Sequence, residues 1–552
     1  TTTFHEAPVL FDSGLSQDGK RARRFILDRT DTSESIERGL MRLLVIWIIL
    51  LSVLYSTLSI LRHNHFQSGG FDLGIYDQAV WQYAHFQWPY NTIKDRFILG
   101  DHLTLTLPLL TPLFWLWEDV RMLLIFQAVW ISFSALAIYK IALLRLSKFD
   151  ALTTITRPRY VCQWTALCLA IVYSLFYGIQ YLVYFDFHPV VIGVGFLAWA
   201  AYFLESGKNR WLVASISLLL LTQENMGLAL AGLGLICLFR LSRHSRERGN
   251  PEYFKLDPRI KSEDDRIRRA GVWFIVLGIA ASLAAARIVA AFSPVGFEYQ
   301  PEIPRNPWVI LSRFFDHPEK LHVWWWSFAS FSFLPLLSPG AVLAVVSDLA
   351  QYFATGDHFV QMWTPYKHHR AILGVFLTLG TLDALVLLKR WKISPERVAV
   401  VLLGVALILQ YLWHLPLNKL TKAEYWKQET WMVDNRKLFA LVPAGAAVAT
   451  QQNIVSHLSH RNQIYLAWPR LHDFADNPCG QTSCWWLDFD KRAEYLVVDT
   501  RPDQWLTQIL ESNEHWREAI RNMEKIKIIK LVESVGFARM YEVSSQDVII
   551  NK

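Results

Sequence analysis

Acidic and basic side chains recur at the ends of the apolar segments of this chain, where they could build a polar site. Six groups contain residues able to do chemistry: Asp72 with Asp77, Asp101 with His102, Asp186 with His188, Glu224, Asp357 with His358, and Lys367 with His368 and His369. Ionised groups are costly in hydrocarbon, so a membrane protein that gathers them at one face commonly uses that face. A simple topology places all six groups on one side of a membrane and predicts one site built from several loops.

The pair Asp72 and Asp77 suits acid–base chemistry. Both lie in the stretch 71–86, whose apolar residues recur at helical spacing and predict an amphipathic helix on the membrane surface. A carboxylate that is partly desolvated there by aromatic neighbours could act as a general base toward a hydroxyl group. Helix capping or solubilisation is the alternative, because amphipathic helices normally carry such acids. We take Asp72 as the catalytic candidate and Asp77 as its support.

Neighbouring carboxylate and imidazole groups could bind a divalent cation, because both ligand types suit several metals. Such groups occur in Asp101 with His102 and in Asp186 with His188. For Asp186 a helix cap or a polar turn is favoured, since aspartate is a preferred cap. Glu224 falls between two apolar runs without a basic neighbour, so it faces water, protein or a ligand, or else lies in a short exposed loop. We expect Asp101, His102, His188 and Glu224 to line a substrate cavity, and leave its dependence on metal open.

A basic cluster of Lys367, His368, His369 and Arg370 precedes an apolar run. Cations at the start of a helix suit a phosphate or pyrophosphate group, which the helix N-terminus also favours. An anionic lipid headgroup would draw on the same physics. The cluster therefore predicts a phosphate-binding surface under either interpretation.

Composition places the chain among polytopic membrane proteins. Of its 552 residues, 53% are hydrophobic and only 19% are charged, whereas ordinary soluble chains carry about 25% charged residues. The net charge of +7 is not a nucleic-acid signature, because the Lys and Arg residues cluster between apolar runs, where they set the topology. Membrane lipids, rather than nucleic acids, are the expected partners.

Apolar runs predict a mainly α-helical, polytopic fold with about eleven transmembrane helices. The runs are 43–61, 122–143, 162–184, 190–204, 211–221, 226–241, 271–292, 323–337, 341–353, 371–388 and 398–413. Basic residues flank the ends that are expected in the cytoplasm. The segment 103–117 is apolar but short and contains Pro108 and Pro112, so we interpret it as interfacial or re-entrant.

The topology divides the chain into regions. These are a cytoplasmic tail, 1–42; a transmembrane domain, 43–414, with an inserted cytoplasmic loop, 242–270, that resembles a translated repetitive DNA element; and an extracytoplasmic α/β domain, 415–552. The last region is predicted from a fall in hydropathy and from alternating short strands and helices. Its Cys479 and Cys484 would suit a local disulfide if the region faces an oxidising compartment.

Several motifs resemble those of an uncharacterised bacterial integral membrane-protein family, known as a domain of unknown function. The matching segments are FDLGIYDQAVW at 71–81, GDH at 100–102, FHP at 187–189, QENMGL at 223–228 and VSHLSHR at 455–461. The resemblance covers most of the chain outside the N-terminal tail and the inserted loop, and the first motif is quite specific.

The layout of that family is similar to the GT-C glycosyltransferase superfamily, which includes the protein mannosyltransferases and the lipid A aminoarabinose transferases. The similarity implies a multi-span core, a large first outer loop with an acidic residue, and a C-terminal outer domain. It also implies a polyprenyl-phosphate sugar as donor, with Asp72 at the position of the acid that handles the acceptor. The acid pair and acceptor motif of many GT-C enzymes have no clear counterpart in the sequence, so reaction and substrate rest on analogy of fold.

The expected function is inverting glycosyl transfer from a polyprenyl-phosphate donor at the outer face of a bacterial inner membrane. Asp72 would orient or deprotonate the acceptor hydroxyl, and the basic cluster at 367–370 would stabilise the departing lipid phosphate. A transporter or flippase of a lipid-linked substrate and a non-catalytic envelope protein are the alternatives. Ionisable residues within the apolar runs are scarce, which weighs against transport.

Overall fold

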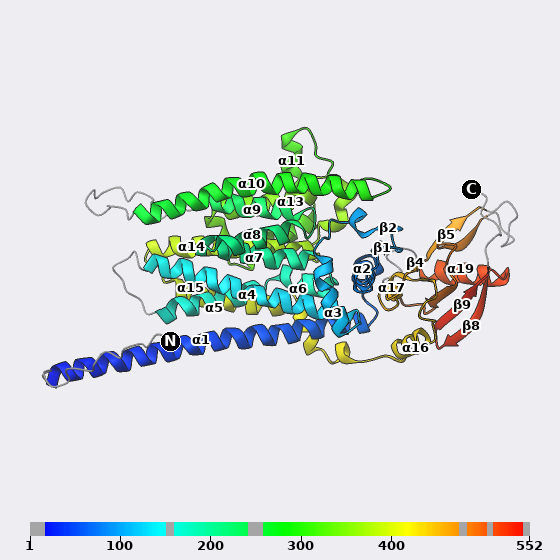
Figure 1. The fold of residues 1–552 in the computed structure, drawn as a ribbon, viewed down its shortest axis with the longest axis horizontal. Helices are drawn as coiled ribbons and strands as arrows, with labels where there is room; N and C mark the ends of the chain where they lie inside the picture. The colour runs from blue at the N-terminus through cyan, green and yellow to red at the C-terminus, as the bar shows by residue number, and fades with distance from the viewer. Residues whose placement is uncertain (1–16, 151–158, 241–257, 474–482, 505–511, 545–552) are drawn as a thin grey trace, which may run out of the picture.

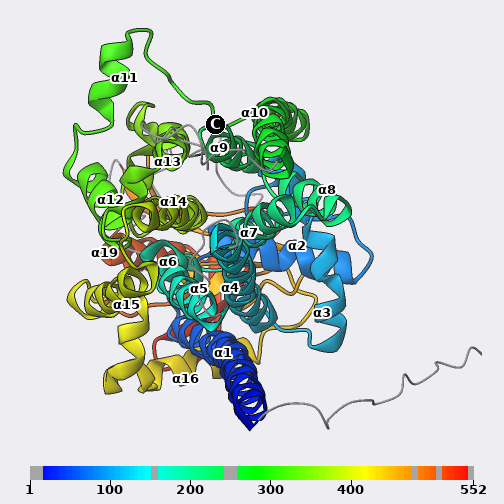
Figure 2. The ribbon, with the colours of Figure 1, turned by 90° about the vertical axis from the view of Figure 1, so that its left-hand side faces the viewer.

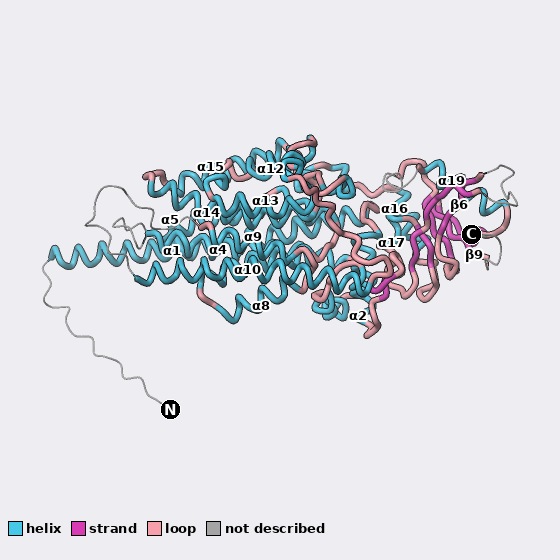
Figure 3. Tube along the Cα trace, turned by 90° about the horizontal axis from the view of Figure 1, so that it is seen from above, coloured by secondary structure: helices cyan, strands magenta, loops and turns pink. Residues whose placement is uncertain are grey.

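The computed structural model describes residues 17–150, 159–240, 258–473, 483–504 and 512–544. Within these residues the helices form an elongated bundle, and the strands gather at one end of its long axis (Figures 1 and 3). The apolar runs lie on helices because a helix satisfies its backbone hydrogen bonds internally, as hydrocarbon demands. The polytopic helical fold expected from the sequence is confirmed.

Five of the described helices contain segments long and apolar enough to cross a membrane. They are α1 (Gln17–Asn64), α4 (Arg121–Asp150), α10 (Pro258–Phe292), α14 (Ala371–Arg390) and α15 (Pro395–Leu412). A further candidate is the pair α5 (Arg159–Ser174) and α6 (Tyr177–Phe185), which meet at a bend of 44°. Figure 2 shows these helices end-on, running along the bundle.

The remaining apolar runs form shorter helices. They are α7 (Val190–Ser206), α8 (Asn209–Leu220), α9 (Met226–Leu238), α12 (Pro318–Ala329) and α13 (Pro339–Phe353). All eleven predicted runs therefore lie on helices, but only five or six of the described segments reach spanning length. The difference arises because a hydrocarbon core of roughly 30 Å needs about 20 helical residues, and α8 has only 12.

Glycines hold α9 close to its neighbours. A Cβ at Gly227 of α9 would lie 2.2 Å from the carbonyl oxygen of Gly278 in α10. A Cβ at Gly340 of α13 would lie 2.8 Å from Cα of Ile236 in α9. Small residues of this kind let helix backbones approach closely within a bilayer. The sequence of α9 thus fixes its distance from both α10 and α13.

A buried ionic cluster joins several helices at the end of the bundle away from the strands. Arg145 Nη2 lies 2.7 Å from Glu205 Oε1, and Arg145 Nη1 lies 2.9 Å from Asp383 Oδ1. Arg240 also pairs with Glu205, and the Ser338 hydroxyl donates to Asp383 Oδ2 at 2.8 Å. All five side chains are buried. Two guanidinium groups face two carboxylates, and their mutual attraction offsets part of the cost of burying these charges.

The polar loops collect at the end of the bundle nearest the strands (Figure 1). The loop after α1 contains η1 (Gly70–Gly74), α2 (Ile75–Ala84), β1 (Tyr90–Asn91), β2 (Arg96–Phe97), η2 (Ile98–Gly100), η3 (Leu107–Leu110) and α3 (Thr111–Leu116). The predicted helix over 71–86 is present as η1 and α2. Its expected place on the membrane surface is wrong, because Leu73, Tyr76 and Val80 are fully buried. The segment 103–117 forms only short helical turns, as its prolines predict.

Later loops carry short helices only. They are α11 (Pro307–Arg313), η5 (Leu334–Leu337), η6 (Asp357–Met362), η7 (His368–Arg370), η8 (Pro416–Thr421), η9 (Ala423–Trp426) and α16 (Thr430–Phe439). The turns η6 and η7 lead into α14, so the basic cluster lies at the loop end of a spanning helix.

The C-terminal region contains a five-stranded sheet in the order β4-β3-β7-β9-β8. Its elements are β3 (Val448–Thr450), α17 (Gln452–Val455), β4 (Ile464–Leu466), β7 (Tyr495–Asp499), α19 (Asn513–Lys525), β8 (Ile529–Val535) and β9 (Ala538–Val543). β3 pairs in parallel with β4 and β7, whereas β9 runs antiparallel to β7 and β8. The α/β character predicted for this region is confirmed.

An antiparallel hairpin, β5 (Trp468–His472) with β6 (Cys484–Asp488), lies beside α19. Trp516 and Met523 of α19 share one apolar core with Leu496 of β7 and Trp486 of β6. Cys484 is disulfide-bonded, while Cys479 lies outside the described residues, so their pairing with each other stays a prediction.

Buried hydrogen bonds fasten the C-terminal region to the first loop. The Thr92 hydroxyl donates to the Ile464 carbonyl at 2.7 Å, and Gln78 Nε2 donates to the Arg461 carbonyl at 3.1 Å. At η1, a Cβ on Gly70 would lie 2.9 Å from Cβ of Val455 in α17. The first loop is therefore enclosed between the bundle and the sheet, which explains why α2 is buried.

Candidate functional site

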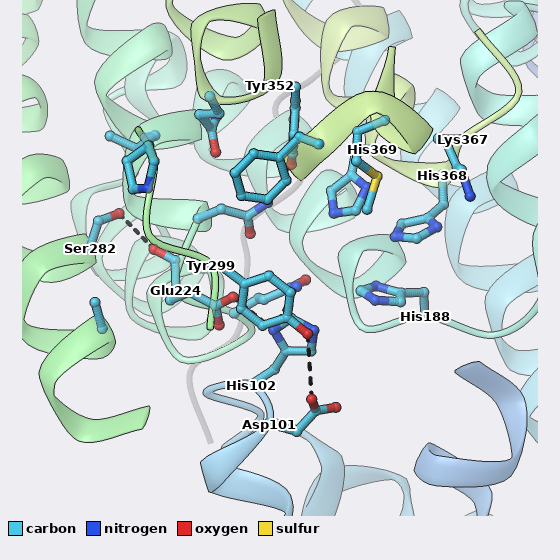
Figure 4. Close-up of a pocket in the computed structure, with 18 of the residues that line it drawn as sticks. Asp101, His102, His188, Glu224, Ser282, Tyr299, Tyr352, Lys367, His368 and His369 are labelled. Carbon is cyan, nitrogen blue, oxygen red and sulfur yellow. Dashed lines mark hydrogen bonds and ion pairs between the residues drawn. The ribbon is translucent and has the colours of Figure 1, made fainter. Parts of the chain in front are cut away.

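A cavity of about 620 Å³ lies where the polar loops meet the helix bundle (Figure 4). Its polar lining includes eight of the residues predicted from the sequence: Asp72, Asp101, His102, His188, Glu224, Lys367, His368 and His369. They come from loops spread along the sequence from Asp72 to His369. The shared pocket that the sequence predicts is therefore present for these eight side chains.

Glu224 and His102 form the central pair of the cavity. Glu224 lies in the turn between α8 and α9, and its Oε1 is 2.7 Å from His102 Nδ1. The second carboxylate oxygen accepts from the Leu103 amide at 3.2 Å, and Ser282 of α10 donates to the Glu224 carbonyl at 2.6 Å. Burial alone would lower the pKa of His102, but the charges of Glu224 and Asp101 outweigh it and raise that pKa. The pair therefore favours an imidazolium beside a carboxylate.

Asp101 is held by two donors at the edge of the cavity. Its Oδ1 lies 2.5 Å from Lys94 Nζ and 3.4 Å from the Tyr299 hydroxyl. Burial opposes ionisation of Asp101, but His102 and Lys94 outweigh it and lower the pKa of the carboxyl. The Tyr299 ring also stacks on the His102 ring at a centroid distance of 4.7 Å. Asp101 is thus ionised, and its Oδ1 already accepts from Lys94 and Tyr299.

Three histidine rings pack together along another wall of the cavity. The His188 and His368 centroids are 3.9 Å apart, and those of His368 and His369 are 4.0 Å apart. His188 Nε2 lies 3.2 Å from the Tyr76 hydroxyl, and burial lowers the pKa of His188 well below 6.5. Within the part of the chain that the structure describes, both ring nitrogens of His368 and Nδ1 of His369 are buried without a hydrogen-bond partner. Buried polar atoms normally have partners, so these nitrogens suit a ligand.

Metal binding finds no further support in this wall. Among the described residues, no group of three or more His, Cys, Asp or Glu side chains is placed to hold a metal ion. The possible divalent cation named from the sequence therefore has no defined ligand set in this part of the chain.

Asp72 is another carboxylate that lines the cavity. It is carried by η1, where Gly70 and Gly74 leave room for Val455 of α17 to pack against the backbone. Within the described part of the chain its carboxylate makes no hydrogen bond or ion pair. Burial raises the pKa of Asp72, while Lys367 and other cations act in the opposite direction. A carboxylate that is unpartnered and unusually basic can accept a proton from a substrate.

Lys367 supplies a cation at the same cavity. Its ammonium lies 5.0 Å from the centroid of the Phe185 ring, and burial lowers the pKa of the amine. Within the described residues it forms no ion pair with a carboxylate, so its charge is available to an anionic ligand.

Asp77 and Arg370 do not line the cavity. Asp77 is fully buried and lies 3.0 Å from His460 Nε2, while its carboxylate also accepts from the Ser459 hydroxyl. Arg370 is also fully buried and donates to the carbonyls of Met362 and Thr364. The first fastens α2 to the C-terminal region, and the second shapes the turn before His368.

Asp186 also has a structural role, because it binds neighbouring parts of the chain. It accepts from the Gly69 amide at 2.9 Å and pairs with Arg62 at the end of α1. Its carboxyl is buried, and burial raises its pKa to about 7. The polar-turn interpretation of Asp186 agrees with this geometry, because the residue holds the chain just before η1.

Some lining residues are not among those predicted from the sequence. Lys94 precedes Asp101 by seven residues, and its basic charge in an acidic loop could have been noted. Tyr76 belongs to the first motif, but Tyr299 lies in a loop of mixed composition far from any other group. Only the folded chain brings Tyr299 onto His102.

An apolar wall completes the cavity. It includes Ile279 and Leu283 of α10, whose side chains are also 45% and 66% exposed on the outside of the protein. On a spanning helix, such exposure faces lipid. The cavity thus combines polar loops at one end with an apolar side formed by a helix that is long enough to span a membrane.

A family model described as "Predicted membrane protein (DUF2079)" matches residues 62–522. The chain belongs to this family. The match begins at the last turns of α1 and contains every residue of the cavity, so the site described here lies wholly within the DUF2079 region. No curated protein matches the chain.

Proposed function

We propose that this DUF2079 protein is a glycosyltransferase that moves a sugar from a polyprenyl-phosphate donor to an acceptor at the outer face of a bacterial inner membrane. The observation that carries the proposal is the set of side chains that lines the cavity. The Asp72 carboxylate, a set of cations and histidines, and a lipid-facing apolar wall border the same space. An amphiphilic substrate with a polar head and a long apolar tail fits such a space.

The acceptor side of the reaction is assigned to Asp72. Its carboxylate would take the proton of an acceptor hydroxyl as the oxygen bonds to the anomeric carbon of the sugar. The bond between that carbon and the phosphate oxygen breaks in the same displacement, with inversion, and the electron pair leaves with the polyprenyl phosphate. The raised pKa of Asp72 favours this role, since a base works best when its pKa approaches the working pH.

The donor side is assigned to Lys367, His368 and His369. Charge grows on the phosphate as it departs, and fixed donors help most where charge develops. The unpartnered ring nitrogens of His368 and His369 point to a ligand that supplies hydrogen-bonding oxygens. The polyprenyl chain would lie against Ile279 and Leu283 and reach the bilayer from there.

The outer orientation rests on charge and on one cysteine. Basic residues at the ends of α4 and α7, including Lys148 and Lys208, lie at the end of the bundle away from the cavity, as expected for a cytoplasmic end. Cys484 of β6 is disulfide-bonded, which suits an oxidising compartment. Both support an extracytoplasmic site next to an extracytoplasmic C-terminal domain.

The direct test is consumption of lipid-linked sugar by the purified protein in reconstituted vesicles. We expect the wild type to release polyprenyl phosphate and Asp72→Asn to be slower by about 100-fold or more, the usual contribution of a general base. Asp95→Asn is the matched control, because Asp95 is an exposed carboxylate of the same loop that does not line the cavity. Equal rates for Asp72→Asn and wild type would reject the assignment.

Transport of the same amphiphile is the second candidate, since a cavity with an apolar side serves a flippase equally well. The vesicle experiment separates the two. A flippase would move a labelled lipid-linked sugar between leaflets and leave its sugar–phosphate bond intact, whereas the proposed enzyme breaks that bond.

A further inference from the structure

A second cavity of about 320 Å³ lies between the end of α1, the segment 415–432 and the C-terminal sheet. None of its lining residues lines the first cavity. Four of them, Asn453, Arg501, Asp503 and Gln504, come from the sheet region, and others come from η8, η9 and the residues after α1. The second cavity is therefore lined by parts of the chain that are far apart in sequence.

The topology of the sheet places this cavity where α/β sheets bind ligands. β3 lies between β4 and β7, so the chain leaves β3 toward one side and later returns on the other. All three strands are parallel. In open sheets of this kind, ligands bind outside the carboxyl ends of the strands where the order reverses. Asn453 follows the carboxyl end of β3, and Arg501 and Gln504 follow that of β7.

Asn453 lines the second cavity with a largely buried amide side chain. Its side chain is only 3% exposed, and its Nδ2 donates to Gln504 Oε1 at 3.3 Å. Its Oδ1 has no hydrogen-bond partner among the described residues. An acceptor buried without a donor is costly, and a ligand hydroxyl at this position would satisfy it.

The charges around the second cavity are mixed in sign. Its lining holds three lysines and Arg501 together with Glu424, Glu429 and Asp503. Arg501 is already paired with Asp499 at 2.8 Å. Cations and carboxylates in nearly equal number favour a neutral ligand that both donates and accepts hydrogen bonds over a strongly charged one.

Aromatic rings supply the rest of the lining. Phe66, Tyr425 and Trp431 border the cavity. One face of Trp431 is covered by the Arg501 guanidinium at 3.2 Å, and one face of Phe66 by the His457 ring at 4.2 Å. The remaining aromatic surface beside amide, carboxylate and ammonium groups offers apolar contact and hydrogen bonds together, which suits a ring carrying several hydroxyl groups. We propose that the second cavity binds a monosaccharide unit, held by Asn453 and the flanking charged side chains.

The position of α17 links this site to the first loop. Asn453 lines the second cavity, and the adjacent Gln452 lies against Gly69 and Gly70, where a Cβ would come within 3.1 Å of its side-chain amide. Asn453 of the sugar site is thus adjacent in sequence to Gln452, which contacts the backbone just before Asp72. The proposal itself concerns binding and does not depend on the transferase reaction.

The test uses the full-length protein in lipid nanodiscs and a panel of free sugars. Glucose, galactose, mannose, N-acetylglucosamine, rhamnose and arabinose are each examined by saturation-transfer NMR, with inorganic phosphate as the contrasting probe. We expect saturable binding of at least one sugar and none of phosphate. Binding of no sugar in the panel, or of phosphate in preference, would overturn the proposal.

Variants locate the binding. Asn453→Leu removes the acceptor at similar size, and Asp503→Ala removes an exposed carboxylate with little risk to folding. Each is expected to weaken the sugar by about tenfold, the usual effect of one lost hydrogen bond. Glu494→Ala, an exposed carboxylate outside the cavity, should leave affinity unchanged. Unaltered binding by both Asn453→Leu and Asp503→Ala would place the sugar elsewhere and refute the assignment.

Discussion

The charge of the pair formed by His102 and Glu224 depends on pH. The pKa of His102 is raised in the folded protein, so folding favours the protonated imidazole. The resulting stability is fully present below the ordinary pKa of 6.5 and is lost as pH rises through the raised value. His188, whose pKa is lowered, contributes in the opposite direction, so only a comparison between variants isolates the pair.

Glu224→Gln should therefore flatten the decline of thermal stability above pH 6.5. The glutamine keeps the size of the side chain but no longer attracts the imidazolium. Melting temperatures of wild type and variant are measured in nanodiscs at a series of pH values. If the two curves stay parallel throughout, His102 is not charged through Glu224.

Asp77 should matter for folding more than for chemistry. Asp77→Ala leaves the Ser459 hydroxyl and His460 without their buried acceptor, which costs about 1–3 kcal/mol. We expect a lower unfolding temperature for this variant than for Asp72→Asn, whose carboxylate has no partner to lose among the described residues. A normal melting temperature combined with loss of sugar transfer would instead give Asp77 a direct part in the reaction.

Individual site residues could be found in the sequence, but their grouping into pairs could not. Asp72, Glu224 and His369 stand out because charged groups are rare beside apolar runs. Nothing in the sequence separates Asp72, which has no partner among the described residues, from Asp77, whose carboxylate accepts from the Ser459 hydroxyl. That distinction depends on contacts between residues more than 380 positions apart, and no local pattern contains it.

At the scale of elements, apolar runs predict where helices are but not how far they reach. The short helix α9 is held at close range to α10 by glycines that look unremarkable in the sequence. The first loop shows the same limit. The helical spacing at 71–86 correctly predicts α2, but its burial follows from α17 and β4, which are far along the chain.

The contact between α9 and α10 gives a test at this scale. Gly278→Val places side-chain atoms against the carbonyl oxygen of Gly227, a backbone group that cannot move aside. The two helices must separate, and overpacking of this kind costs about 1–3 kcal/mol. Gly404→Val in α15 is the control, because nothing lies within 4 Å of its Cβ position.

Thermal unfolding should therefore rank Gly278→Val well below Gly404→Val. Because Ser282 and Leu283 follow on the same helix, the first variant should also distort the wall of the first cavity. Equal stability of the two variants would show that α9 and α10 are not packed as described.

On the scale of the whole molecule, the two ends of the bundle differ in chemistry. One end holds the open cavity and the sheet, and the other holds the compensated cluster around Arg145. The proposed topology places these ends on opposite sides of the membrane. Glu514→Cys on α19 and Lys208→Cys between α7 and α8 are exposed positions that report on each end.

In a background without native cysteines, a membrane-impermeant maleimide should label Glu514→Cys in intact spheroplasts. Lys208→Cys should react only after the membrane is opened. Labelling of both positions from the same side would contradict the topology and, with it, the proposed outer-face reaction.

The ionic cluster around Arg145 also sets a condition on biosynthesis. Arg145 is translated 60 residues before Glu205 and 238 residues before Asp383. Until α14 leaves the ribosome, a guanidinium group destined for burial lacks one of its counter-ions, and bare charge in lipid is expensive. We therefore expect the nascent α4 to keep the Arg145 guanidinium group in water or against the insertion machinery. The ion pair between Arg145 and Asp383 forms only when the last third of the polypeptide is made.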